Sequence, residues 1–184
     1  MSGDCRQLFW AVTMLVASSA SAQPGIDDLS VVADAEGAYR LESRFFVEAS
    51  SATAWQVLTD YERIDEFVPS VRRSEVKERL GDGLLLEQEW VTRVLFFTRA
   101  LRVVLLIREE PDTGILFRDL SGKDFEFYEG SWRIEPSTQG VWVRYELRVK
   151  PVFSVPGFVA KYIFKKSAED LLGEVRSELL RRNR

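Results

Sequence analysis

The sequence contains no histidine, and its only cysteine is Cys5, close to the amino terminus. The domain that follows therefore has no histidine-based catalytic triad, no histidine metal site and no cysteine zinc site. No loop carries the clustered aspartates of a calcium-binding loop either. The sequence thus points to no metal and no cofactor, and it lacks the side chain that enzymes use most often for proton transfer.

An excess of positive charge is also absent. The chain carries 25 Lys and Arg against 29 Asp and Glu, for a net charge of −4. Nucleic-acid binding depends strongly on attraction between basic side chains and phosphates, so the composition indicates no nucleic-acid partner. Apolar residues make up 46% of the 184 residues, which is enough for the core of one domain.

The first 22 residues have the pattern of a secretory signal peptide. Arg6 gives a weakly positive start, an apolar run covers Leu8–Val16, and Ala22 ends a small-residue cleavage motif. The run is too short to span a bilayer comfortably. We therefore expect cleavage between Ala22 and Gln23 and an exported, periplasmic protein. Cys5 would leave with this segment, so the mature chain would depend on packing rather than disulfides for stability.

Residues 23–36 are predicted to be a flexible leader, because Pro24, Gly25 and several acidic residues favour no regular element. The rest, 37–184, is predicted to form one α+β domain. It begins with a strand over Ala38–Ala49 and two short helices over Ala52–Thr59, capped by Ser50 or Ser51, and Glu62–Phe67. Six strands separated by turn residues follow, at Val71–Arg79, Leu84–Thr92, Arg99–Arg108, Gly114–Leu120, Phe125–Glu135 and Val141–Lys150.

Short turns between consecutive strands indicate antiparallel hairpins. Alternation of apolar and polar residues predicts that the last strand has one buried face, and the strand over Arg99–Arg108 follows the same rule. The inward residues would be Val141, Val143, Tyr145, Leu147 and Val149 in the first case, and Leu101, Val103, Leu105 and Ile107 in the second.

A long helix is predicted over Gly157–Arg182, because apolar residues recur there at the spacing of one helical face. This face would comprise Phe164, Ala168, Leu171, Val175 and Leu179, with Lys165, Glu169, Arg176 and Glu178 lying away from it. The concave side of the sheet is the one large apolar surface on which such a helix could pack. Gly173, which is unfavourable in a helix, suggests a close approach to the sheet.

This order of a strand, two short helices, six strands and a long helix is the helix-grip arrangement. In the segments SATAWQVLTDYERIDEFVPSV, GSWRIEP and VRYELRVKP and in the closing helix, the chain resembles the START-like superfamily, and most of all its polyketide cyclase/dehydrase and coenzyme Q-binding branch. The resemblance covers residues 38–183. It implies a curved antiparallel sheet of about seven strands packed on the long helix, with a cavity between them. The fold hosts lipid carriers, cyclases, hydrolases and hormone receptors, so it does not choose a function by itself.

Candidate cavity residues come from inward strand positions and from the first half of the long helix. Gln88, Arg99 and Asp119 are the polar candidates, and an Arg99–Asp119 pair could hold a ligand headgroup, because a buried charge needs a partner. The same two residues also fit strand ends in water. Each of the other candidates, taken singly, also fits an ordinary core: they are Trp90, Phe117, Trp132, Tyr145, Leu147, Val159, Tyr162 and Ile163.

The expected function is non-catalytic binding or transport of an apolar small molecule, such as a lipid, a quinone or a polyketide-like compound. The alternative is a cyclase/dehydrase-type enzyme acting on an aromatic or polyketide substrate in the same cavity. Such an enzyme would need enolate stabilisation and proton transfer, for which Arg99, Tyr145 and Asp119 are the candidates.

Two surface features suggest further contacts. The stretch Phe158–Ile163 is the expected lid of the cavity, and Lys161, Lys165 and Lys166 beside its aromatics form either a transient contact with an anionic membrane surface or an ordinary solvated face. Trp142, at an outward position, is a candidate contact for a protein partner.

Overall fold

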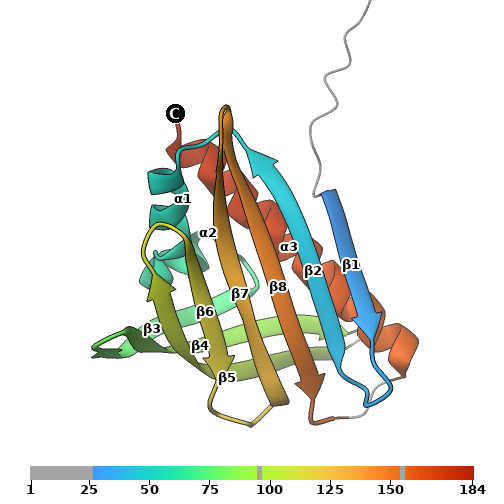
Figure 1. Ribbon diagram of the computed structural model, residues 1–184. Coiled ribbons are helices and arrows are strands. Elements are labelled where there is room, and N and C mark those ends of the chain that lie inside the picture. The colour runs from blue at the N-terminus through green and yellow to red at the C-terminus, as the bar shows by residue number, and fades with distance from the viewer. Residues whose placement is uncertain (1–26, 95–96, 154–155) are drawn as a thin grey trace, which may run out of the picture.

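The computed structural model describes residues 27–94, 97–153 and 156–184, and most of them lie in strands that are joined by short turns. These residues form one antiparallel sheet that curves around a long helix (Figure 1). The strands are β1 (Asp27–Ala33), β2 (Tyr39–Val47), β3 (Val71–Leu80), β4 (Gly83–Val94), β5 (Phe97–Glu110), β6 (Gly114–Asp119), β7 (Phe125–Ser137) and β8 (Gly140–Pro151). The helices are α1 (Ser51–Leu58), the single 3-10 turn η1 (Tyr61–Arg63), α2 (Ile64–Phe67) and α3 (Gly157–Arg182).

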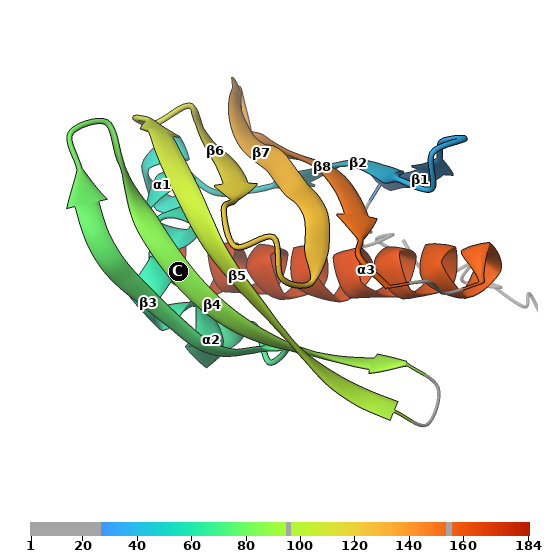
Figure 2. The same ribbon diagram turned by 90° about the horizontal axis from the view of Figure 1, so that it is seen from below.

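The eight strands lie in the order β1-β2-β8-β7-β6-β5-β4-β3. From β3 to β8 each strand pairs with the next one along the chain, and β2 pairs with β8 across the long sequence gap between them. Figure 2 shows α3 lying along the inner side of this curved sheet, with α1 and α2 at one end. The predicted helix-grip fold is therefore confirmed.

Residues 27–33 correct the expectation of a flexible leader. They form β1, which pairs with β2 through partners such as Val31 and Leu41. Val31 is buried, and α3 packs on both strands. Pro24 and Gly25 precede this strand in the sequence, so they do not interrupt it. The sheet consequently has eight strands instead of about seven, while the predicted signal peptide and residues 23–26 lie outside the described residues.

Ser50 decides where α1 begins. Its hydroxyl accepts a hydrogen bond from the backbone N–H of Thr53 at 3.0 Å, which satisfies one of the free donors at the helix start. The cap is therefore Ser50 and not Ser51. The helix ends at Leu58, and η1 and α2 follow shortly after, so the two predicted short helices are present. They lie at one end of the sheet (Figure 2).

The buried faces of β5 and β8 agree with the predicted alternation, because all nine inward residues named for them are buried. The prediction for Trp142 as a partner contact is weakened by its surroundings. The guanidinium of Arg44 lies 4.2 Å from the centre of the Trp142 ring, and the Phe46 ring lies 5.3 Å away. Both cover the indole, and Trp142 is partly buried.

The packing face of α3 differs from the prediction at its end. Leu172 and Leu179 are fully buried, whereas Leu171 is half-buried. Glu178 was expected to face away, yet it is buried, because Arg181 and Arg182 each donate hydrogen bonds to its carboxylate at 2.6 Å. Arg182 also reaches Asp60 at 2.7 Å, which ties the end of α3 to η1.

Gly173 makes no close approach to the sheet. A Cβ atom built on it would meet no atom within 4 Å, outside its own helix backbone, so the expectation is wrong. Among the described residues, no helix combines the length and the apolar character that crossing a membrane requires.

Candidate ligand cavity

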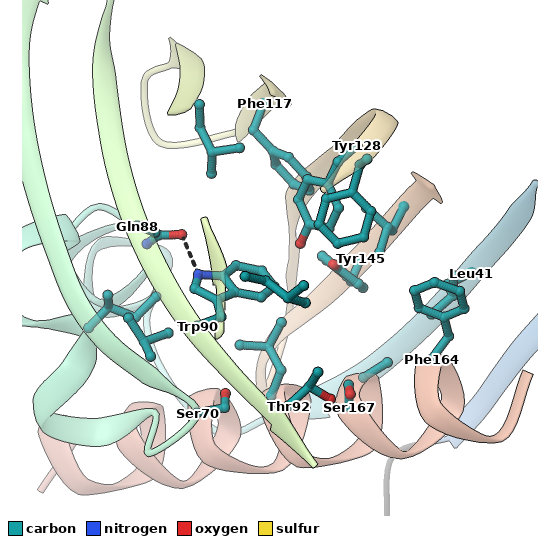
Figure 3. Close-up of a pocket in the computed structure, with 18 of the residues that line it drawn as sticks. Leu41, Ser70, Gln88, Trp90, Thr92, Phe117, Tyr128, Tyr145, Phe164 and Ser167 are labelled. Carbon is teal, nitrogen blue, oxygen red and sulfur yellow. Dashed lines mark hydrogen bonds between the residues drawn. The ribbon is translucent and has the colours of Figure 1, made fainter. Parts of the chain in front are cut away.

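A cavity of about 180 Å³ lies between the concave side of the sheet and α3. Its wall takes side chains from β2 to β8, from the short helices and from the first two thirds of α3 (Figure 3). An apolar cavity of about 150 Å³ is large enough to hold a benzene ring. Within the described part of the chain, Arg99 is the one charged residue on this wall.

Five aromatic rings form a continuous surface along the sheet side of the cavity. The Trp90 and Tyr128 rings meet edge to face at 5.5 Å, and Phe117 lies 5.7 Å from Tyr128 and 6.3 Å from Tyr145. Trp132 then packs on Tyr145 with their centres 4.5 Å apart. Such a wall offers flat contact area and few polar groups, which suits an apolar or ring-containing ligand.

Gly130 makes room for this aromatic surface. It lies between Tyr128 and Trp132 on β7, at the same inward parity. A Cβ atom at this position would come within 2.6 Å of the Phe117 ring and within 2.1 Å of the carbonyl oxygen of Glu146. Only glycine at this position therefore leaves room for the Phe117 ring, which packs between Tyr128 and Tyr145.

Gln88 and Trp90 form a polar chain on the wall. Gln88 is buried and donates a hydrogen bond from its amide nitrogen to the Ser74 hydroxyl at 3.0 Å. Its amide oxygen accepts a hydrogen bond from the indole nitrogen of Trp90 at 3.0 Å (Figure 3). This chain satisfies buried polar atoms and holds the indole plane in one orientation.

Tyr128 and Tyr145 place two hydroxyl groups inside the cavity. Both side chains are buried, and Figure 3 shows them converging. Burial raises the pKa of both hydroxyls above the ordinary tyrosine value, and the nearby Tyr145 adds to the increase for Tyr128. The two groups therefore stay protonated at neutral pH and can act as hydrogen-bond donors.

Arg99 and Asp119 do not form the predicted pair. Arg99 lies at the edge of the cavity with a half-exposed side chain, donates a hydrogen bond to Asp124 at 2.9 Å, and stacks on the Phe153 ring at 4.0 Å. Asp119 lies off the cavity wall and accepts hydrogen bonds from the backbone N–H groups of Val104 and Ser121, both at 2.9 Å. The carboxylate of Asp119 holds the turn after β6 in place through these hydrogen bonds. The ion-pair partner of Arg99 is instead Asp124, which lies in the same turn.

The structure places eight of the eleven predicted residues on the cavity wall: Gln88, Trp90, Arg99, Phe117, Trp132, Tyr145, Leu147 and Ile163. Asp119, Val159 and Tyr162 are not among the lining residues. Tyr162 is 69% exposed because the helix turns Ala160 and Ile163, and not Tyr162, toward the sheet. The expected lid therefore divides into an inner and an outer face. Ligand contact by the eight residues stays a prediction.

Tyr128 and the closing helices contribute lining residues that the sequence analysis missed. Tyr128 shares the inward parity of Trp132, so counting back along β7 would have found it. Val57, Leu58, Tyr61, Ile64 and Phe67 come from α1, η1 and α2 and close one end of the cavity. These elements are short, and their orientation depends on tertiary packing that local periodicity does not reveal.

The family described as polyketide cyclase / dehydrase and lipid transport matches residues 47–176. This span runs from the last residue of β2 through most of α3, so it includes nearly all the cavity wall. No curated protein sequence matches the chain.

Solved structures with this fold include both cyclases and lipid transfer proteins. The Zhui aromatase/cyclase from Streptomyces sp. R1128 has a TM-score of 0.69 and 15% identity, over 80% of this chain and 96% of that one. A STAR-related lipid transfer protein from Xanthomonas axonopodis has a TM-score of 0.58 and 20% identity, over 83% and 99% of the two chains. The di-domain aromatase/cyclase StfQ from the steffimycin biosynthetic pathway has a TM-score of 0.64 and 15% identity, over 79% of this chain and 51% of that one, so the chain spans about half its length. These identities show the fold alone.

Proposed function

Because the chain belongs to the polyketide cyclase/dehydrase and lipid transport family, within the START-like superfamily, we propose that it binds and carries an apolar small molecule in its internal cavity. A lipid, a quinone or a polyketide-like compound fits this description. The observation that carries the proposal is the aromatic surface from Trp90 to Trp132, which faces the cavity with five rings. Burying apolar ligand area against such a wall is favourable by about 25 cal/mol per Å².

Catalysis of the cyclase/dehydrase kind is the alternative, because two of the solved structures with this fold are aromatase/cyclases. Acid–base chemistry needs a group that exchanges a proton with a substrate inside the cavity. Asp119, the carboxylate put forward for this role, instead accepts backbone hydrogen bonds away from the wall. Tyr145 and Arg99 remain on the wall as donors that could stabilise an enolate. Binding without catalysis is therefore the better supported proposal.

Native mass spectrometry of the protein purified from its own host tests the binding proposal. We expect a bound apolar molecule that denaturing conditions release, and its mass would identify the compound. Refilling the emptied protein with that compound should change the fluorescence of Trp90 and Trp132, which both line the cavity. A protein that carries no small molecule and whose fluorescence responds to no lipid, quinone or aromatic ketone would contradict the proposal.

We further propose that the protein is exported and that the outer face of α3 touches an anionic membrane during ligand transfer. Phe158 and Tyr162 are 79% and 69% exposed on the first turns of α3. The sequence from 156 to 168 carries Lys161, Lys165 and Lys166 but no acidic residue. Lys165 and Lys166 pair with Glu169 at 3.8 Å and Asp170 at 2.6 Å, one turn further along the helix, so the contact would depend mainly on the two aromatics and Lys161. Exposed aromatics with lysines fit the interface and negative charge of such a membrane.

Vesicle binding tests the membrane contact. Vesicles with a third of anionic lipid should retain the protein in a sedimentation assay, and neutral vesicles should not. Exchanging both aromatics in Phe158→Ala/Tyr162→Ala should reduce retention by about tenfold, because about 1.4 kcal/mol of interfacial contact is lost. The control Val32→Ala removes an exposed apolar residue from β1 and should retain the wild-type level. Equal retention of both variants would contradict the proposed contact.

A further inference from the structure

The cavity contains hydrogen-bond donors that the fold itself leaves unused. Tyr128 and Tyr145 are 4% and 2% exposed, and both line the cavity. Apart from each other, the described residues offer these two hydroxyls no hydrogen-bond partner. Two hydroxyls carry two protons, and a bond between them uses only one. At least one buried donor therefore faces the cavity without an acceptor.

An unsatisfied polar group in an apolar interior is costly, and native structures seldom keep one without a role. Tyr61 shows how a donor is satisfied elsewhere on the same wall, since its hydroxyl donates to Glu109 at 3.0 Å. The indole of Trp90 is satisfied by Gln88 in the same way. Among the described residues, the one fully enclosed side-chain polar atom without a partner is the Ser43 hydroxyl, which does not line the cavity. The hydroxyls of Tyr128 and Tyr145 differ from it because they converge on the space that a ligand would fill (Figure 3).

We propose that Tyr128 and Tyr145 form a donor site for an uncharged acceptor oxygen of the ligand, such as a carbonyl group on a ring-containing apolar molecule. The inference rests on the proposed binding function and narrows its ligand class. The rings of Phe117 and Trp132, packed on Tyr145, would contact the apolar body beside that oxygen. A hydrocarbon of the same shape would fill the cavity but leave the donors unpaired.

The surroundings of the pair favour a neutral oxygen over a carboxylate or a phosphate. The tyrosines lie among apolar and aromatic side chains, and the carboxylate of Asp119 is near enough to Tyr128 to help raise its pKa. A further negative charge there would be buried without a cationic partner, which is very unfavourable. Among the described lining residues the one cation is Arg99, which lies at the half-exposed edge and is already paired with Asp124. The chemistry of this site therefore matches ketones, quinones and enones.

Two probes of nearly equal shape separate the contribution of the carbonyl oxygen to affinity from that of the apolar body. Acetophenone and α-methylstyrene differ only in a carbonyl oxygen replaced by a methylene group. Titration calorimetry would compare their affinities for the wild-type protein and for the variants Tyr145→Phe, Tyr128→Phe and the double variant. Tyr39→Phe is the matched control, because Tyr39 is buried against Phe164 but does not line the cavity.

We expect the double variant to bind acetophenone about tenfold more weakly than the wild type, because the carbonyl loses its donor. Its affinity for α-methylstyrene should stay within about twofold, and the control should change neither. The carbonyl stretching band of bound acetophenone should also lie at lower frequency in the wild type than in the double variant. These results together would establish a donor site.

Two outcomes would overturn the donor site while leaving apolar binding intact. One is an equal loss of affinity for both probes, which would mean that the hydroxyls matter only for packing. The other is unchanged acetophenone binding and an unshifted carbonyl band in the double variant. A wild-type protein that binds neither probe, nor any larger apolar compound, would instead contradict the proposed binding function itself.

Discussion

The indole nitrogen of Trp90 lies 3.0 Å from the amide oxygen of Gln88, which is two residues earlier on the same face of β4. Gln88 is anchored in turn by Ser74 on the neighbouring strand β3. The chain of two hydrogen bonds fixes the indole edge-on against Tyr128. A polar side chain on the cavity wall thus holds one of its two indole rings in place.

Replacing Gln88 with leucine should therefore destabilise the protein. The indole N–H and the Ser74 hydroxyl both lose their partner, and an orphaned polar group of this kind costs about 1 to 3 kcal/mol. Urea unfolding should show a lower midpoint with an unchanged slope. Gln56→Leu is the control, because Gln56 is exposed on α1 and should tolerate the same exchange. A Gln88→Leu protein as stable as the wild type would show that the chain adds nothing.

Glu178 should make the protein sensitive to acid. Hydrogen bonds from Arg181 and Arg182 lower the pKa of its carboxyl from 4.5 to about 2 in the folded state. Its contribution is therefore fully present above pH 4.5 and is lost as the pH falls toward 2. We expect Glu178→Gln to cost about 2 to 3 kcal/mol at pH 7 and to flatten the decline of stability below pH 4.5. Unfolding curves at several pH values test this, with Glu174→Gln on the exposed side as control. Parallel curves for wild type and Glu178→Gln would contradict it.

Buried tyrosines should make the protein sensitive to alkali. Burial raises the pKa of Tyr61, Tyr128 and Tyr145 in the folded state, whereas the unfolded chain ionises near pH 10. The contribution of these tyrosines to stability should therefore be constant below pH 10 and fall above it by about 1.4 kcal/mol per pH unit for each protected tyrosine. Tyr145→Phe should make this decline shallower, and Tyr162→Phe, at an exposed position, should not. Phenolate absorbance that appears well before unfolding would count against the expectation.

Two glycines should respond in opposite ways to alanine. Gly173→Ala should stabilise the protein by up to about 1 kcal/mol, because alanine favours the helix and the new methyl group meets no neighbour. Gly130→Ala should destabilise it strongly, because the same methyl group would collide with the carbonyl of Glu146 and with Phe117. Thermal unfolding of both variants measures the difference. A stabilised Gly130→Ala protein would mean that β7 can shift without cost.

Local sequence signals were sufficient for most of the fold. The turns after Leu80 and Glu110 contain glycine, proline or aspartate, and the strands between them alternate clearly, so each boundary could be predicted within a few residues. The strand β1 was not predicted because its formation depends on pairing with β2. Leu29 and Val31 form too short an alternation to predict a strand without the edge of β2 beside them.

The candidate site was predictable to the extent that side-chain direction follows parity. Trp90, Phe117 and Tyr145 lie on the cavity wall because strand residues two apart share a face. The Arg99–Asp119 pair was wrong because parity says which face a residue takes and not which partner it meets. The actual partner of Arg99 is Asp124, which lies in a turn, where alternation gives no side-chain direction.

The pairing of β2 with β8 has a consequence for how the molecule folds. Tyr39 and Val149 are neighbours in the sheet, although about 110 residues separate them in the sequence. Closing so long a loop is entropically slow, so hairpins from β3 to β8 can form before β2 joins them. Until then the aromatic surface is open to water on one side. We therefore expect a slow last folding step, during which the incomplete sheet is prone to associate with the apolar surfaces of other chains.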